Sequence, residues 1–236
     1  HVNFCYEDGV EVLHDVNFTV KPGQSVAFVG PTGAGKTTIV NLLSRFYNVS
    51  GGEVLIDGQD ISGVTIHSLR RQMGVMMQDS FIFSGTIMDN IRYGNKTATD
   101  EEVIEAAKTV CAHDFIKNME KGYETQVNER GNRLSVGQRQ LISFARALLN
   151  DPAILILDEA TSSIDTETEI ALQKGLGRLL KGRTSFLIAH RLSTIRNSDC
   201  IMYVDHGKIM EAGTHDELLA KKGLYYQLYM SQYAQR

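Results

Sequence analysis

The stretch "SVAFVGPTGAGKTTIVNLLSRF", residues 25–46, decides the fold of this chain. Its first five residues are mostly apolar and predict a short buried strand, and its last ten carry apolar residues at helical spacing. Between them, "GPTGAGKT" at 30–37 matches the pattern GxxxxGK[ST] in full, after a strand and before a helix as the pattern requires. The stretch therefore predicts a strand, a glycine-rich phosphate-binding loop and a helix, in that order.

The residues of this loop suit a nucleotide triphosphate. Glycines let successive backbone N–H groups from Gly33 to Thr38 point at phosphate oxygens, and the dipole of the following helix adds positive potential. We expect Lys36 to reach the β- and γ-phosphates and the Thr37 hydroxyl to coordinate Mg²⁺. A purely structural glycine turn would leave Lys36 unexplained.

Strands and helices alternate outward from this loop in both directions. From about residue 79 to 146 the pattern is helical, and "DEEVIEAAKTVC" at 100–111 is the clearest helix because its first turn is acidic. Strands separated by helices predict a largely parallel sheet covered on both faces, an α/β fold. Strands are expected at 2–6, 11–20, 25–29, 52–58, 73–78, 153–157, 184–189, 200–204 and 207–213.

Composition excludes several classes of protein. The 236 residues are 42% hydrophobic and 22% charged, which is ordinary for a globular domain. A net charge of -4 offers no electrostatic reason to expect nucleic acid as a partner. The three cysteines are scattered without a CxxC pair, so a zinc site or a disulfide framework is not expected, and we interpret them as small buried hydrophobes. No apolar run approaches the roughly eighteen residues of a membrane span, and the absence of a starting Met suggests a domain cut from a longer protein.

An apolar strand that ends in two carboxylates, "AILILDEA" at 153–160, supplies a second part of a nucleotide site. Ligands bind at the carboxyl ends of strands in α/β folds. There Asp158 would hold Mg²⁺, usually through water, and Glu159 could polarise or deprotonate an attacking water. An exposed acidic pair at a strand end is common, but a nucleotide site needs such carboxylates. The phosphate-binding loop therefore favours a functional role for this pair.

A further stretch, "NRLSVGQRQ" at 132–140, places a Ser and a Gly just before a helical run. The Ser135 hydroxyl, the Gly137 amide and a helix N-terminus form an anion grip. A glycine-rich loop wraps one side of a triphosphate, so this second grip would complement the exposed side of the γ-phosphate.

At this point the chain resembles, from end to end, the nucleotide-binding domain of an ABC transporter. "LSVGQ" at 134–138 resembles the family signature, usually LSGGQ, and Gln78 after "MGVMM" matches the Q-loop glutamine. "SSID" at 162–165 resembles the D-loop, His190 the switch histidine, and Tyr6 the aromatic residue that stacks on adenine. "FIFSGTIMDNIRYGN", "AHRLSTI" and "HDELL" are similar to the exporter branch.

The resemblance implies an architecture. It implies a P-loop NTPase core of RecA-like type with an antiparallel β-subdomain and an inserted α-helical subdomain. The core would comprise residues 1–78 and 147–236, and the helical subdomain residues 79–146.

It also implies a site that takes ATP and Mg²⁺. Glu159, His190 and Gln78 would serve catalysis, and Thr37, Gln78 and Asp158 would serve the metal. His190 could reach a γ-phosphate if its strand lies beside the one that carries Asp158. The residues expected to contact the nucleotide are Tyr6, Gly30, Thr32, Gly33, Ala34, Gly35, Lys36, Thr37, Thr38, Ser135, Gly137, Gln138 and Asp165.

In the resembling family, two such domains meet head to tail, so that each nucleotide lies between the P-loop of one and the signature of the other. The expected partners are therefore a second nucleotide-binding domain, identical or related, and a transmembrane domain, with this domain on the cytoplasmic side of the membrane. Glu129 in "NERG" resembles the loop that touches the membrane partner. Val136 departs from the signature, which usually has a glycine at this position. A β-branched residue is stiffer than glycine.

Other nucleotide-binding classes fit less well. A P-loop GTPase would need an NKxD-type motif, and "NKTA" at 95–98 has Ala98 in place of Asp. A chromosome or DNA-repair ATPase would carry a long coiled coil between P-loop and signature, and a tandem translation factor would repeat the P-loop. An ATP-gated interaction module without transport stays open as the alternative, although Glu159 argues for hydrolysis.

Overall fold

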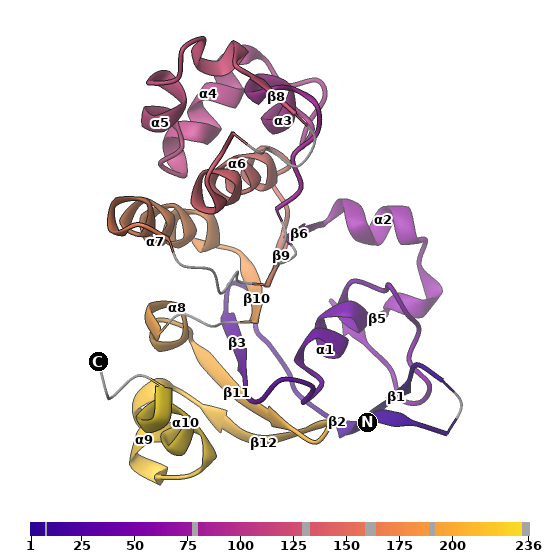
Figure 1. Ribbon diagram of the computed structural model, residues 1–236. Coiled ribbons are helices and arrows are strands. Elements are labelled where there is room, and N and C mark those ends of the chain that lie inside the picture. Colours follow the sequence, from indigo (N-terminus) through magenta and orange to yellow (C-terminus); the bar gives the residue numbers. More distant parts are fainter. Residues whose placement is uncertain (8, 77–79, 129–132, 159–163, 189–191, 233–236) are drawn as a thin grey trace. The chain divides into compact units, whose positions relative to one another are not determined.

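The computed structural model describes residues 1–7, 9–76, 80–128, 133–158, 164–188 and 192–232 (Figure 1). The chain divides into two compact units. The first comprises His1–Met73, Ile154–Glu159 and Thr184–Arg236, and the second comprises Gly74–Ala153 and Ala160–Arg183. The expected helical subdomain, 79–146, falls inside the second unit, and its proposed bounds stay a prediction.

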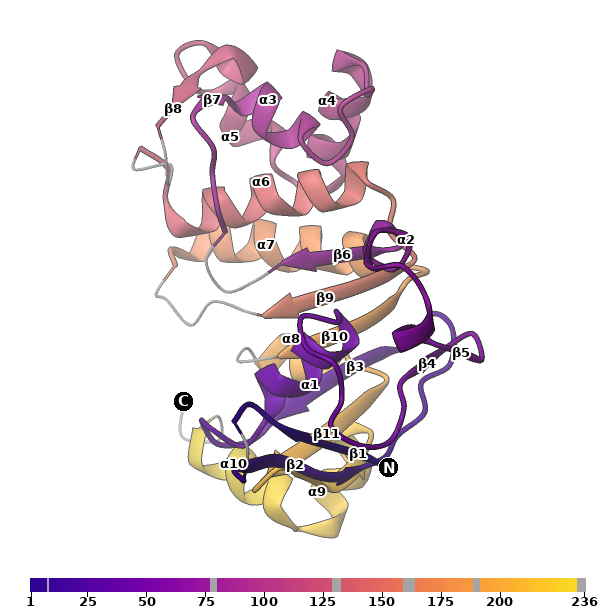
Figure 2. The same ribbon diagram turned by 90° about the vertical axis from the view of Figure 1, so that its right-hand side faces the viewer.

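A mostly parallel sheet forms the centre of the first unit (Figures 1 and 2). Its strand order is β12-β11-β3-β10-β9, in which β12 alone is antiparallel to its neighbour. Helices α1 and α8 lie on opposite faces of this sheet. These elements are β3 (Ser25–Val29), β9 (Ile154–Asp158), β10 (Thr184–Ile188), β11 (Cys200–Asp205), β12 (Lys208–Gly213), α1 (Lys36–Leu43) and α8 (Leu192–Arg196).

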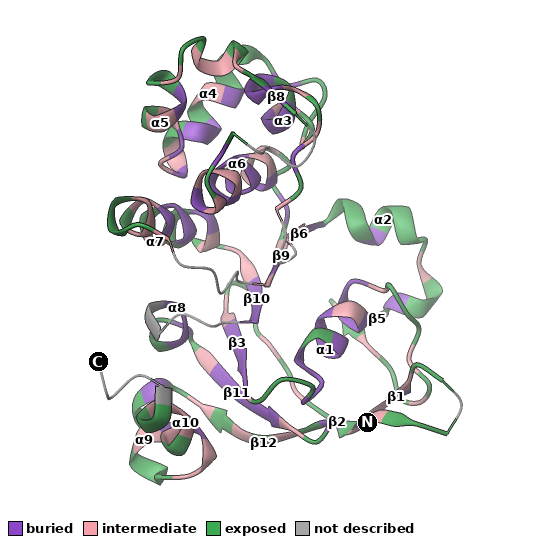
Figure 3. Cartoon of the chain, viewed as in Figure 1, coloured by how far each residue is buried: buried purple, intermediate pink, exposed green. Residues whose placement is uncertain are grey.

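The central strands are mostly apolar because both faces of the sheet are covered. Phe28 of β3, Leu187 of β10 and Ile156 of β9 have no exposed surface, and most of β3 has the colour of buried residues in Figure 3. In the described residues, these strands begin and end within one residue of the predicted positions. The α/β prediction from alternating patterns is therefore confirmed for this unit.

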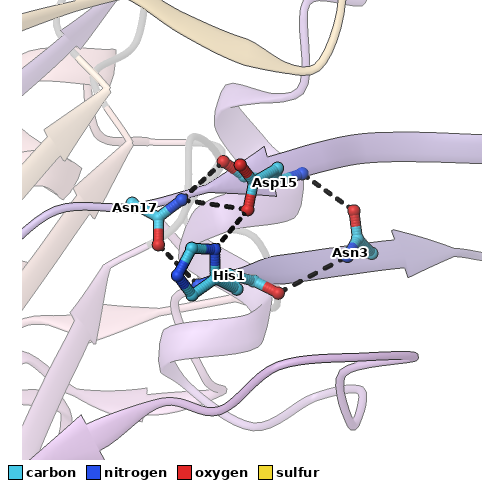
Figure 4. A network of polar contacts seen from close by, with 4 residues as sticks. All are labelled: His1, Asn3, Asp15 and Asn17. Atoms are coloured by element: carbon cyan, nitrogen blue, oxygen red, sulfur yellow. Dashed lines mark hydrogen bonds and ion pairs between the residues drawn. The ribbon is translucent and has the colours of Figure 1, made fainter.

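Antiparallel hairpins flank this sheet in the first unit. Strand β1 (Val2–Cys5) pairs with β2 (Glu11–Val16), and hydrogen bonds among His1, Asn3, Asp15 and Asn17 tie the two strands together at one end (Figure 4). The strands expected at 11–20 and 52–58 are shorter than predicted. Beyond Val16, residues 17–20 lie outside the sheet, and only β4 (Leu55–Ile56) pairs with β5 (Gln59–Asp60).

The remaining elements of the first unit are short. The last two helices contact each other, and a hydrogen bond of 2.7 Å joins His215 Nδ1 and the Tyr225 hydroxyl in the buried space between them. Strand β6 begins at the last residue of this unit and continues into the second. The elements are η1 (Ile61–Gly63), α2 (Ile66–Arg71), β6 (Met73–Met76), α9 (His215–Lys221) and α10 (Leu224–Gln232).

The second unit is mainly helical, and its helix α6 contacts α3, α4 and α7. Near the end of α6, Arg146 lies over the Phe83 ring and donates hydrogen bonds to the carbonyl oxygens of Asn90 and Phe81. Its elements are β7 (Gly85–Thr86), α3 (Ile87–Arg92), α4 (Asp100–Thr109), α5 (His113–Lys117), η2 (Gly122–Glu124), β8 (Gln126–Val127), α6 (Val136–Leu149) and α7 (Thr166–Leu180).

Two further sequence expectations need correction. The short strands β7 and β8 interrupt a region predicted to be helical throughout, because two residues per strand leave no visible alternation. The cysteines, interpreted as buried, are only partly so: Cys5, Cys111 and Cys200 are free thiols of intermediate exposure. In the part of the chain that the structure describes, no helix is long and apolar enough to cross a membrane.

Candidate functional site

The phosphate-binding loop leaves the carboxyl end of β3 and enters α1, as the sequence predicts. Gly30 opens the loop with φ 136°, and a Cβ at this position would lie 2.0 Å from the Val204 carbonyl oxygen of β11. Only glycine fits so close to a neighbouring strand. Further along, the Gly207 N–H of the β11–β12 turn donates to the Ala34 carbonyl at 3.0 Å, so this turn supports the loop from behind.

Lys36 is nearly buried inside the curve of the loop, with 8% of its surface exposed. Its Nζ donates to the carbonyl oxygens of Gly30 and Pro31, both at 2.7 Å. Burial lowers the pKa of Lys36 from its ordinary value, and the negative charge of Asp158 acts in the opposite direction. The loop therefore holds a cation at the position where a triphosphate would need one. The other loop residues expected to contact nucleotide surround it: Thr32, Gly33 and Thr37 are exposed, and Ala34, Gly35 and Thr38 are buried.

Strand register brings Asp158 to the same edge of the sheet. In the parallel sheet, Asp158 of β9 is aligned with Ile188 of β10, and Ile188 is aligned with Phe28 of β3. Since the loop begins two residues after Phe28, the carboxylate and the loop share the carboxyl edge, where α/β sheets bind ligands. Strand β10 also lies beside β9, which is the condition set for His190, two residues beyond Ile188.

The donor set can be tested against Mg²⁺. Magnesium in nucleotide sites is usually held by one or two protein groups together with phosphate oxygens and water. Among the described residues, no group of three or more His, Cys, Asp or Glu side chains could hold a metal by itself. The Asp158 carboxylate and the exposed Thr37 hydroxyl, two groups at one sheet edge, fit a metal that also needs the phosphates of a bound nucleotide.

Tyr6 lies against the first turn of α1 and is not a core residue. Its hydroxyl is 3.1 Å from Thr38 Oγ1, and 47% of its surface is exposed. The rings of Phe4 and Tyr47 meet it at nearly a right angle, with centroids 4.8 and 5.0 Å away. These contacts hold an exposed aromatic ring beside the phosphate-binding loop, which is the placement that a base-stacking residue requires.

The predicted second anion grip lies in the other compact unit, at a capped helix start. Ser135 is the N-cap of α6: its Oγ accepts the Gln138 N–H at 3.1 Å, and the Gln138 side chain accepts the Ser135 N–H at 3.0 Å. The Ser135 O–H can still donate to an anion, because a hydroxyl both accepts and donates. Asp165 caps α7 in the same way by accepting the Thr168 N–H at 2.9 Å, and this bond lowers the pKa of its carboxyl.

Some of the predicted site residues lie outside the described part of the chain. The structure also shows contacts at the site that the sequence did not predict. Gln78, Glu159, His190 and Glu129 are in the first group. The second group includes the Tyr6–Thr38 contact and the support of Ala34 by Gly207. No local pattern announces these pairs, because each joins segments far apart in the chain.

Comparisons with known proteins agree with this geometry. A family model described as ABC transporter matches residues 13–162. The ABC transporter ATP-binding protein YknV of Bacillus subtilis is 57% identical over 233 residues, which cover 99% of this chain and 39% of YknV. A fatty acid ABC transporter ATP-binding/permease protein of Mycobacterium bovis is 51% identical, over 97% of this chain and 36% of its own length.

A solved structure is similar over almost the whole chain. A bacterial Atm1-family ABC exporter with ATP bound matches with a TM-score of 0.91 and 46% identity, over 98% of this chain and 41% of the exporter chain. The chain thus spans about two fifths of the length of the proteins it matches. The predicted P-loop architecture is confirmed by this likeness.

Proposed function

The chain belongs to the ABC transporter family, and on that premise we propose that it is an ATPase domain that powers export. It binds ATP and hydrolyses it, and an attached membrane domain uses the released free energy to move a substrate. The observation that carries this proposal is Lys36, held inside a complete phosphate-binding loop at the sheet edge that Asp158 shares.

Binding of the triphosphate falls to the loop of the first unit. Two of the Lys36 N–H donors go to the carbonyls of Gly30 and Pro31, and an ammonium group has three donors. In the contacts of the described residues, a third N–H is thus left for a phosphate oxygen. The loop amides up to Thr38 add further donors, and the Tyr6 ring beside them would stack on adenine.

Hydrolysis needs a group that acts on water, and Glu159 follows the metal ligand Asp158 directly. We assign Glu159 the role of polarising or deprotonating the water that attacks the γ-phosphorus, with ADP leaving as the bond to the bridging oxygen breaks. Mg²⁺, held by Thr37, Asp158 and Gln78, would neutralise charge on the phosphate oxygens. His190 would contact the γ-phosphate.

The second grip serves a nucleotide held by another copy or a related chain. Ser135, Gly137 and Gln138 would close over the γ-phosphate of the ATP that lies on the partner domain's loop, with Asp165 nearby. This arrangement makes ATP part of the interface, so binding brings two domains together and hydrolysis releases them. Support comes from the capped helix α6, which leaves the Ser135 O–H able to donate.

A membrane partner is supported by the relatives. The Mycobacterium bovis protein is named an ATP-binding/permease protein, and this chain covers only 36% of it. We propose that this domain likewise works on the cytoplasmic side of a membrane, joined to a transmembrane domain, and that Glu129 contacts that domain.

Two substitutions test the proposed hydrolysis. Lys36→Ala should abolish binding of a fluorescent ATP analogue, because the phosphates lose their cation. Glu159→Gln should keep that binding and slow phosphate release by at least about a hundredfold, the lower end of what general-base catalysis contributes.

Glu167→Gln, at an exposed acid in the first turn of α7, is the matched control and should hydrolyse ATP at the normal rate. Near-normal hydrolysis by Glu159→Gln would remove Glu159 from the mechanism, and unchanged binding by Lys36→Ala would refute the nucleotide site itself.

A further inference from the structure

Gly137, in the first turn of α6, lies where packing between two helices leaves no room for a side chain. Its proposed contact with phosphate does not account for this. It is buried, and its φ lies outside the left-handed region, so its backbone does not demand glycine. A Cβ at this position would lie 2.2 Å from Thr168 Cγ2 and 3.2 Å from Ile164 Cγ2. The first distance is far below any real carbon–carbon contact, so α6 approaches α7 as closely as it does only because residue 137 has no side chain.

Thr168 cannot easily move out of the way. It is the third residue of α7, and a threonine within a helix is largely confined to two χ1 rotamers. Its N–H is also bound to the Asp165 carboxylate at 2.9 Å, which holds the first turn of α7 in place. The methyl group of Thr168 is therefore a fixed surface against which the start of α6 rests.

This contact connects two groups that the proposed function assigns to the nucleotide. Ser135 caps α6 two residues before Gly137, and Asp165 caps α7 three residues before Thr168. All four residues belong to the second compact unit. The contact between Gly137 and Thr168 thus sets the separation between the Ser135 hydroxyl and the Asp165 carboxylate.

We propose that Thr168 is a positioning residue for the second phosphate grip: its methyl group, packed on Gly137, holds the Ser135 and Asp165 caps at one spacing. The consequence for ATP rests on the proposed function, whereas the contact itself does not. A side chain at residue 137 would push the two helix starts apart by about an ångström, and displacements of this size can cost about a hundredfold in rate.

A compensating pair of substitutions tests the proposal. Gly137→Ala adds the Cβ that meets Thr168, and Thr168→Ser removes only the methyl group that it meets. Gly137→Ala alone should lower the thermal midpoint and reduce ATP hydrolysis at least tenfold. The double variant should recover hydrolysis to within about threefold of the original chain. Thr166→Ser, the same change at an exposed position of α7, is the control and should not rescue Gly137→Ala.

Binding of a fluorescent ATP analogue to the phosphate-binding loop separates positioning from general damage. This binding should stay within about twofold in every variant, because the loop belongs to the other compact unit. If Gly137→Ala yields no folded protein, recovery of folded, active protein in the double variant would still show that the Thr168 methyl group obstructs the added Cβ.

Two results would overturn the proposal. One is a double variant no more stable and no more active than Gly137→Ala, since the methyl group is then not the obstacle. The other is a double variant that regains its thermal midpoint while hydrolysis stays low, since the contact then does not position the grip. If the original chain does not hydrolyse ATP, the proposed function fails, and the thermal midpoints still decide whether the Gly137–Thr168 contact exists.

Discussion

At the scale of single residues, Thr38 connects two parts of the proposed nucleotide site. Its backbone belongs to the turn of α1 that follows Lys36, and its hydroxyl lies 3.1 Å from the Tyr6 hydroxyl. Thr38 is buried, whereas almost half of the Tyr6 surface is exposed. The ring is therefore anchored at its hydroxyl end and contacted by the rings of Phe4 and Tyr47, while almost half of its surface stays open. The loop that binds phosphate thus also orients the group proposed to bind the base.

This anchoring predicts the effect of changes at Tyr6. Tyr6→Ala should weaken ATP binding by about 1–3 kcal/mol, the range found for aromatic–base stacking in nucleic-acid complexes. Tyr6→Trp should keep most of the affinity. Titration with a fluorescent ATP analogue measures both.

Tyr93→Ala removes a tyrosine of similar exposure, 54%, from the other compact unit and is the matched control. Inorganic triphosphate, which has no base, should bind Tyr6→Ala as well as it binds the original chain. Equal ATP affinity in Tyr6→Ala and the original chain would mean that this ring does not stack on the base.

At the scale of elements, Ser135 at the start of α6 has two roles, one in capping the helix and one proposed in binding phosphate. Ser135 stabilises the helix, because its Oγ accepts the Gln138 N–H and the Gln138 side chain accepts the Ser135 N–H. The same hydroxyl is proposed to donate to a phosphate. A capping box of this kind is visible in the sequence as a Ser followed three residues later by a Gln.

A charged substitution at Ser135 can separate these two roles. Ser135→Asp should keep the helix capped, since Asp is as good an N-cap as Ser, and the unfolding free energy should change by less than about 0.5 kcal/mol. The added negative charge should repel a γ-phosphate, so ATP-dependent association of two domains should be lost.

Ser135→Ala should affect stability more and association less than Ser135→Asp does. It removes the cap and should lower the unfolding free energy by about 1 kcal/mol. It also removes the hydroxyl donor but adds no charge, so ATP-dependent association should weaken without being lost. Denaturant unfolding and gel filtration with ATP measure the two effects. Normal ATP-dependent association of Ser135→Asp would show that no phosphate approaches this helix.

At the scale of the whole molecule, the two proposed phosphate grips belong to different compact units. Lys36 lies in the first unit and Ser135 in the second. The proposed function assigns them to different nucleotides, each shared by two chains. A test of this assignment needs two defective chains in one assembly.

Mixing Lys36→Ala with Ser135→Arg provides that test, if the chain pairs with itself. In a mixed pair with shared sites, both defects fall on one nucleotide, and the other nucleotide meets an intact Lys36 and an intact Ser135. Mixing should therefore restore trapping of labelled ATP at one site per mixed pair, although each variant alone traps none.

Tagged copies of the two chains show whether mixed pairs form. If mixed pairs form and no trapping returns, Ser135 serves the nucleotide of its own chain and the shared-site proposal is wrong. Trapping is the measurement, rather than turnover, because the two sites can depend on each other to complete a cycle.

The sequence by itself determined the features that depend on local pattern. The strand, loop and helix around Lys36 follow from apolar periodicity and glycine spacing within 22 residues, and all three are present in that order, although the helix ends at Leu43 and not at residue 46. The motif order identified the family, which the comparisons confirm. The roles of Gln78, Glu159 and His190 stay predictions, because these residues lie outside the described part of the chain.

Tertiary structure decided what depends on distances between separate segments. Gly30 looked like a phosphate-binding glycine, and the structure adds that the Val204 carbonyl excludes any side chain there. Gly137 looked like part of an anion grip, and the close packing of α6 on α7 gives it a steric role as well. Periodicity tells which face of an element is buried, but not how near its neighbour lies; that distance is set only when segments far apart in the chain pack together.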